Sequence, residues 1–194
     1  MTSMGILLNI TLFAAIWMTL LWIWQALKKD ATIVDVGWAF GMAGAAIYLG
    51  IFGTGDPIRR VVFAALTAIW ALRLGWFLYL TRVHGRTSED GRYRRMRIAM
   101  GSKAQLGFFG FFHAQTLFVT IFTIPLLGPA SSARPFPGIL DYLGVAIWVA
   151  AMTGEWIADR QLHSFVRNPE NKGKTCRVGL WNYTRHPNYF FEWV

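Results

Sequence analysis

GILLNITLFAAIWMTLLWIWQAL, residues 5–27, is the stretch that decides the fold of this chain. It holds no charged residue, and a helix of this length spans the roughly 30 Å hydrocarbon core of a bilayer. Further apolar runs of similar length cover about residues 34–52, 61–80, 106–127 and 138–157. Such runs are typical of membrane-spanning helices. The sequence therefore predicts an all-α fold, a polytopic transmembrane helical bundle.

Composition agrees with one membrane domain over residues 1–194. Hydrophobic residues make up 55% of the chain and charged residues 15%, against roughly 25% charged in a soluble domain. We expect five complete helices and the start of a sixth near Tyr189, because Pro187 favours a helix start. Val194 follows within a turn or two, so further C-terminal helices are expected beyond it.

The net charge of +9 is distributed in a pattern that indicates membrane topology rather than nucleic-acid binding. Lys28 and Lys29 lie in one connection, seven Lys and Arg lie between residues 82 and 103, and six lie between residues 160 and 185. The alternate connections hold Arg59, Arg60 and Arg134. The positive-inside rule then places the basic loops in the cytoplasm and the N-terminus outside. Membrane lipids are the expected polyanionic partner.

Three polar features interrupt the apolar segments before the C-terminal part. Asp35 opens the second run, where it either caps the helix or faces a site. The basic loop at 81–105 contains Glu89-Asp90-Gly91-Arg92-Tyr93. Its arginines either hold a polyanion such as a dinucleotide phosphate, or set topology and contact lipid. His113, alone in its apolar run, is expected to make an interhelical hydrogen bond.

Residues 153–194 collect the remaining polar chemistry. Glu155, Asp159 and His163 recur every four residues, which places them on one helix face. They and the nearby arginines form either an interfacial salt-bridge network or a nucleotide site, because carboxylates accept from ribose and guanidinium groups match phosphate. No Cys/His spacing fits zinc, the isolated histidines do not fit a di-iron site, and no Gly-x-Ser-x-Gly turn is present.

These residues carry a family resemblance. Gly154-Glu155, Asp159-Arg160-Gln161-Leu162, Gly179-Leu180-Trp181 and Arg185-His186-Pro187-Asn188-Tyr189-Phe190-x-Glu192 resemble the C-terminal domain of the steroid 5-alpha-reductase family. The similarity is strongest to its bacterial branch, the DUF1295 membrane proteins. The segments 34–38 and 89–93 also resemble that branch, so the likeness runs from about residue 33 to 192.

The resemblance implies a membrane reductase that transfers hydride from NADPH to a carbon–carbon double bond conjugated to a ketone. The substrate would be a steroid-like or other lipophilic small molecule entering from the bilayer of a bacterial inner membrane. Residues 153–194 would form the cofactor-binding portion. The resemblance implies cofactor contacts at Glu155, Asp159, Arg167, Arg177, Arg185, His186 and Asn188, catalytic roles for Glu192, Tyr189 and Asp35, and no metal.

The sequence also departs from the family pattern. The Gln-Glu pair that holds the ketone in steroid enzymes has no match in 34–52, and Phe191 stands where Gly or Cys is usual. Two other functions remain open. The Arg-His-Pro element is shared with S-adenosylmethionine-dependent membrane methyltransferases of the isoprenylcysteine type. A non-catalytic membrane protein could use the same polar cluster to anchor its cytoplasmic loops.

Overall fold

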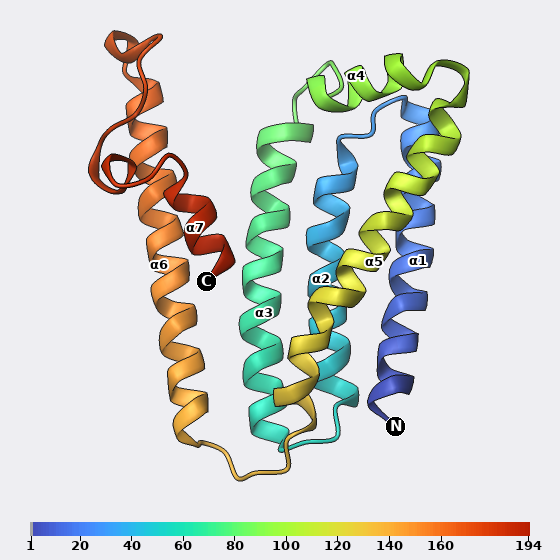
Figure 1. The fold of residues 1–194 in the computed structure, drawn as a ribbon, viewed down its shortest axis with the longest axis vertical. Coiled ribbons are helices and arrows are strands. Elements are labelled where there is room, and N and C mark those ends of the chain that lie inside the picture. Colours follow the sequence, from blue (N-terminus) through green and yellow to red (C-terminus); the bar gives the residue numbers. More distant parts are fainter. Residues whose placement is uncertain (1) are drawn as a thin grey trace. The chain divides into compact units, whose positions relative to one another are not determined.

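The computed structural model describes residues 2–194, which form helices and connecting loops with no strand among them. The α-helices are α1 (Ser3–Lys28), α2 (Ile33–Phe52), α3 (Pro57–Leu78), α4 (Gly91–Met100), α5 (Ala104–Ser131), α6 (Ile139–Arg167) and α7 (Pro187–Trp193). Figure 1 shows their order along the chain. The all-α prediction is confirmed.

Two compact units make up the chain: unit 1 is Met1–Phe136 and unit 2 is Pro137–Val194. Unit 1 holds α1 to α5, and unit 2 holds α6 and α7. The prediction of one membrane domain over 1–194 stays a prediction, and each unit is described by itself.

Four helical stretches among the described residues are long and apolar enough to cross a membrane: Ser3–Lys28, Ile33–Phe52, Pro57–Val83 and Gly91–Ser131. They confirm four of the five expected spans. The fifth, at 138–157, forms the first part of α6, but this helix is not among the four. Asp141 and Glu155 lie near the two ends of its apolar stretch and lower its hydropathy. That α6 crosses the membrane stays a prediction.

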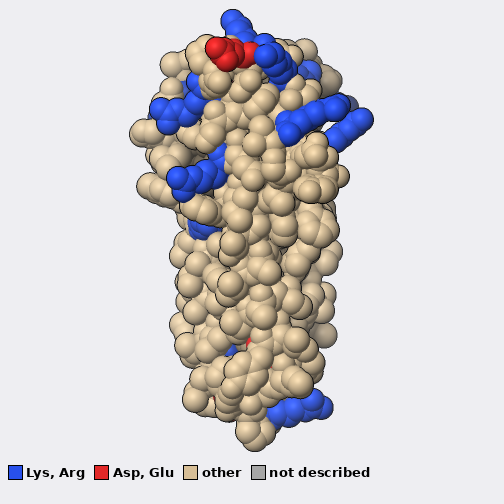
Figure 2. Space-filling model, turned by 90° about the vertical axis from the view of Figure 1, so that its left-hand side faces the viewer, with Lys and Arg blue, Asp and Glu red and all other residues tan. Residues whose placement is uncertain are grey.

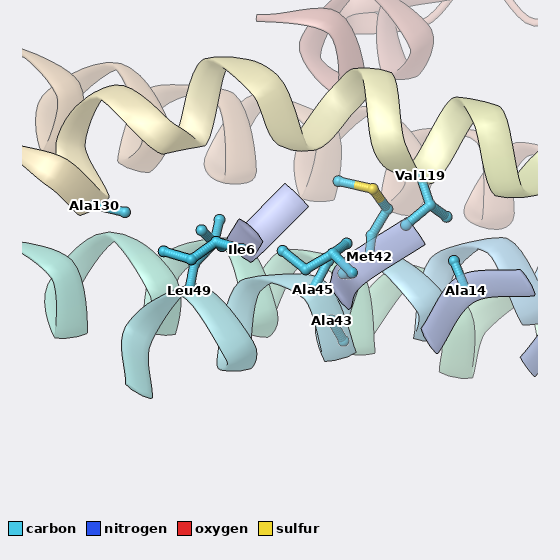
Figure 3. Close-up of a cluster of buried hydrophobic side chains, with 10 residues drawn as sticks. Ile6, Ala14, Met42, Ala43, Ala45, Leu49, Val119 and Ala130 are labelled. Carbon is cyan, nitrogen blue, oxygen red and sulfur yellow. The ribbon is translucent and has the colours of Figure 1, made fainter. Parts of the chain in front are cut away.

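Unit 1 is organised around α2, whose small residues let its neighbours come close. A Cβ added to Gly37 would lie 2.2 Å from a methyl carbon of Leu21, and one added to Gly44 would lie 2.7 Å from the ring of Phe13. Figure 3 shows the resulting core, in which Ala43, Ala45 and Leu49 of α2 are buried. Small residues allow helices to approach without a hydrophobic drive between them, so the glycines and alanines of α2 serve the packing of unit 1.

Polar pairs also join the helices of unit 1. Asn9 donates to the Tyr48 hydroxyl at 2.8 Å, and Thr19 lies 3.3 Å from Nε2 of His113. His113 therefore makes the interhelical hydrogen bond that was expected of it. Hydrogen bonds of this kind hold helices together where lipid offers no partner.

The loop expected at 81–105 is more ordered than its charge pattern indicates. A π-helical turn at Tyr79–Val83 extends α3, α4 follows, and a 3-10 turn covers Gly101–Lys103. Asp90 begins α4 by accepting the backbone N–H of Arg92, as an N-cap residue does. Figure 1 shows α4 lying across one end of the other helices of unit 1.

Glu89 ties α4 to the turn between α1 and α2. Its carboxylate is 8% exposed, and it accepts the Ala31 N–H at 2.8 Å and an Arg97 N–H at 2.7 Å. Arg97 also donates to Gln25 at 3.2 Å, and Gln25, fully buried, donates to Gln105 at 2.9 Å. The buried side chains of this hydrogen-bond network, Gln25 and Glu89, both have partners, which offsets the cost of removing them from water.

Lys and Arg side chains remain exposed around this network. Arg86, Arg94, Arg95 and Lys103 lie at the surface of the connection between α3 and α5. Figure 2, which draws the face on the α6 side of Figure 1, shows Lys and Arg mainly toward one end of that face. In the connection between α3 and α5, Arg97 supports the fold through Glu89, and the exposed basic side chains are those available to anionic headgroups.

Replacing Glu89 should loosen α4. In Glu89→Ala, the Ala31 N–H and the Arg97 guanidinium lose their shared acceptor, so we expect the free energy of unfolding to fall by about 3 kcal/mol. Denaturant unfolding in detergent micelles measures this loss. Arg94→Ala, which removes an exposed side chain of the same helix, is the control and should change stability little. Equal stability of the two variants would contradict the anchoring role.

Candidate functional site

Asp35, one of the predicted catalytic residues, lies in the first turn of α2 and is not its cap, since the N-cap position is Thr32. Its carboxylate accepts from the Tyr93 hydroxyl at 2.6 Å, from Arg82 at 2.6 Å and from Arg92 at 2.9 Å. The hypothesis that Asp35 caps the helix is therefore wrong, and Asp35 instead forms ion pairs with Arg82 and Arg92. The catalytic role of Asp35 stays a prediction.

Arg92 also pairs with Asp90 at the start of α4. The Arg92 Nε lies 3.1 Å from the carboxylate, and the side-chain and backbone hydrogen bonds from Arg92 lower the pKa of Asp90 below its usual value. A hydrogen-bonded carboxylate of this kind stays charged over a wider pH range. It therefore remains an acceptor at the start of α4 down to low pH.

The junction of α6 and α7 brings together two predicted cofactor residues that are far apart in sequence. Pro187 is buried and starts α7, which places Asn188 in its first turn. The Asn188 amide donates to the carboxylate of Asp159 at 3.2 Å. This contact joins α6 to the Arg-His-Pro-Asn-Tyr element, so Asp159 and Asn188 belong to one local site.

The second polar atom of the Asn188 side chain has no protein partner. Its Oδ1 is buried and makes no hydrogen bond within the described residues 2–194. The orientation of the amide follows from its contact with Asp159, because a carboxylate accepts and an NH₂ group donates. The site thus contains one buried, unused acceptor beside a carboxylate.

Close packing between α6 and α7 surrounds this pair. A Cβ added to Gly154 would lie 2.4 Å from the ring of Phe191, so the glycine is what lets the aromatic ring lie against α6. Glu155, the next residue, is 4% exposed. Phe191 departs from the family pattern, and Gly154 provides the space that its ring occupies.

The connection between α6 and α7 is fixed by contacts that the sequence did not predict. Gln161 accepts the Leu180 N–H at 2.9 Å, and the Trp181 indole donates to the Ala158 carbonyl at 2.8 Å. Gly179 has a φ of +56°, and a Cβ there would meet the Gln161 amide at 2.2 Å. A glycine directly before Leu180-Trp181 was the sequence signal for this turn.

The remaining predicted residues of unit 2 are only partly brought together. His186 and Tyr189 stack with ring centroids 5.4 Å apart, and Glu192 lies half-buried one turn further along α7. The three residues expected to share one face of α6 differ in exposure. Glu155 is buried, Asp159 is half-buried and His163 is exposed.

The three arginines predicted to contact the cofactor are all exposed. Arg167 ends α6, whereas Arg177 and Arg185 lie in the connection to α7. None of them forms an ion pair with a carboxylate of the residues that the structure describes. The alternative of a salt-bridge network through these arginines is therefore not observed, and their guanidinium groups are available to a ligand.

Comparison with known proteins assigns the chain to a family. The family described as "Protein of unknown function (DUF1295)" matches residues 21–194, which include both the Asp35 network and the α6–α7 junction. The chain belongs to the DUF1295 family. An uncharacterized protein of Schizosaccharomyces pombe is 25% identical over 215 aligned residues, covering 97% of this chain and 60% of that relative. The DUF1295 chain therefore spans 60% of the relative's length. No solved structure matches it.

The Gly154–Phe191 contact can be tested by thermal unfolding in detergent. Gly154→Ala forces Phe191 away from α6, so we expect the melting temperature to fall by several degrees, the effect of about 1–3 kcal/mol of overpacking. Phe191→Leu in the same chain should restore part of this loss by making room. Gly110→Ala, whose added Cβ meets nothing within 4 Å, is the control. An unchanged melting temperature of Gly154→Ala would show that the close approach is dispensable.

Proposed function

We propose that the chain is a membrane-embedded reductase that uses NADPH to reduce a carbon–carbon double bond conjugated to a ketone in a lipophilic substrate. The observation that carries the proposal is the unused acceptor of Asn188, held beside Asp159. The nicotinamide of NADPH bears a carboxamide whose NH₂ group is a matching donor. A buried acceptor without a partner costs about 1–3 kcal/mol, which such a donor would recover.

Asp159 has a positioning role in this proposal. Because its carboxylate accepts the Asn188 NH₂ at 3.2 Å, the Oδ1 atom of Asn188 is presented as the acceptor. A different amide orientation would place two acceptors against each other. The pair therefore selects a ligand that donates at this point, as a carboxamide does.

The other polar groups of unit 2 fit the rest of the cofactor. The buried carboxylate of Glu155 is an acceptor suited to ribose hydroxyls. Arg167, Arg177 and Arg185 supply guanidinium groups that are not used in ion pairs within the described chain. Planar guanidinium groups match phosphate oxygens with two parallel hydrogen bonds.

NADPH would supply the hydride, and the protein would stabilise the charge that develops on the ketone oxygen. Tyr189 and Glu192 lie three residues apart on α7, beyond the Asn188 contact, and a phenol or a protonated carboxyl donates to such an oxygen. We assign proton donation to these two residues because they lie beside Asn188 on α7. Asp35 belongs to unit 1, where its carboxylate accepts hydrogen bonds from three side chains.

A lipophilic substrate suits the surroundings of this chain. The structure contains four helical stretches able to cross a membrane, with large exposed apolar side chains along them. We infer that substrate enters from the bilayer, with the N-terminus outside and the basic loops in the cytoplasm of a bacterial cell. NADPH, which is charged and water-soluble, would enter from the cytoplasm.

Thermal unfolding of the purified protein in detergent tests the cofactor. NADPH at a hundred times its dissociation constant should stabilise the protein by about 2.7 kcal/mol, because it binds only the folded state. NADH should stabilise less at the same concentration, since it lacks the 2′-phosphate. Stabilisation by S-adenosylmethionine without any by NADPH would favour the methyltransferase alternative. No stabilisation by either would favour a non-catalytic protein.

Asn188→Ala tests the observation on which the proposal depends. Loss of its side chain removes the buried acceptor, so we expect NADPH affinity to fall about tenfold, the effect of one hydrogen bond of about 1.4 kcal/mol. Isothermal titration calorimetry of the detergent-solubilised protein measures it. Asn182→Ala removes an exposed asparagine of the same unit and should bind NADPH normally. Equal affinities of the two variants would remove Asn188 from the site.

A further inference from the structure

A groove of about 470 Å³ lies along the last turns of α6, within unit 2. Trp156, Arg160 and Gln161 line it from the middle of the helix, and Ser164, Asn168 and Asn171 line its far end. None of these six residues was assigned to the cofactor. The groove has the size of a small-molecule site.

The polar groups left free in this groove are mainly hydrogen-bond donors. Gln161 uses its carbonyl oxygen to accept the Leu180 N–H, and Asn168 uses its own to accept the Glu170 N–H. Each therefore keeps an NH₂ group without a protein partner within residues 2–194. Ser164 adds a hydroxyl, and Asn171, whose NH₂ donates to Phe165, contributes its oxygen. Donors outnumber acceptors.

Arg160 gives the groove its charge. Among the nine lining residues, all in the described part of the chain, it is the one that carries a formal charge. Its guanidinium carbon lies 5.1 Å from the centroid of the Trp156 ring. Stacking of this kind holds the planar group by its face and leaves the N–H groups at its edge free for a ligand.

The position of the groove relates it to lipid. The α6 surface before it is apolar and exposed, with Ile147 and Val149 each 50% exposed and Trp156 54% exposed. Residues 143–152 are all apolar, whereas Ser164, Asn168 and Asn171 follow within the groove. A tryptophan between an apolar and a polar stretch is typical of the membrane–water interface, which is the depth of lipid phosphates.

We propose that this groove binds the phosphate of an anionic membrane lipid, with Arg160 as its principal contact and the amides of Gln161 and Asn168 as further donors. The acyl chains would follow the exposed apolar surface of α6 beside Trp156. This inference is separate from the proposed reductase function, because the residues that line the groove are not those assigned to the cofactor.

Native mass spectrometry of the detergent-purified protein with dioctanoylphosphatidylglycerol tests this site. The wild-type protein should bind one lipid saturably, and Arg160→Gln should bind it at least tenfold more weakly. Lys174→Gln, which removes an exposed positive charge of unit 2 outside the groove, is the matched control and should bind within twofold of wild type. Within residues 2–194 the Arg160 guanidinium stacks on Trp156 and forms no ion pair, so its replacement should leave folding intact, which the melting temperature checks.

Two ligand controls separate the sources of the signal. Dioctanoylglycerol, which has the same chains and no phosphate, should not bind saturably. Inorganic phosphate should not displace the lipid at equal concentration, because it lacks the acyl chains. Equal binding of phosphatidylglycerol by wild type and Arg160→Gln, or equal binding of the two lipids, would overturn the proposal. Displacement of the lipid by NADPH would assign the groove to the dinucleotide instead.

Discussion

The carboxylate of Asp35 is the constraint on which unit 1 depends. It accepts hydrogen bonds from Arg82 at the end of α3 and from Arg92 and Tyr93 in α4, so one side chain of α2 holds two other segments. Apolar contacts alone do not fix how helices are rotated in a bilayer, because lipid chains are as apolar as leucine. Hydrogen bonds and ion pairs between helices supply that specificity. The ion pair of Glu89 with Arg97 is a second such interaction.

The apolar helices could be predicted because hydropathy directly measures the cost of placing backbone and side chains in lipid. The first run, expected at 5–27, is helix Ser3–Lys28, and the helix expected to start near Tyr189 is α7, which begins at Pro187. The helix α4 was missed because it is short and charged. Asp90 directly before Gly91-Arg92 could have predicted the start of α4, because Asp is a preferred N-cap residue. The partners of Asp35 could not be predicted from periodicity, because they lie 47 to 58 residues away.

In the candidate site, too, some features could be predicted from the sequence and others could not. Spacing along α6 predicted a shared face for Glu155, Asp159 and His163, but spacing does not say where that face becomes exposed. The family resemblance implied that Asp159 and Asn188 each contact the cofactor, but it did not predict their contact with each other, 29 residues apart. The Gly154–Phe191 contact could not have been predicted, since Phe191 departs from the family pattern. The position of the Phe191 ring depends on Gly154, which lies in another helix.

Hydrogen–deuterium exchange of the detergent-purified protein, with and without saturating NADPH, tests the cofactor site most directly. If the α6–α7 junction holds the nicotinamide, NADPH will slow exchange in peptides covering residues 154–162 and 179–193. The same peptides will be unaffected by S-adenosylmethionine. Unchanged exchange in both segments at saturating NADPH, or protection there by S-adenosylmethionine alone, would contradict the account.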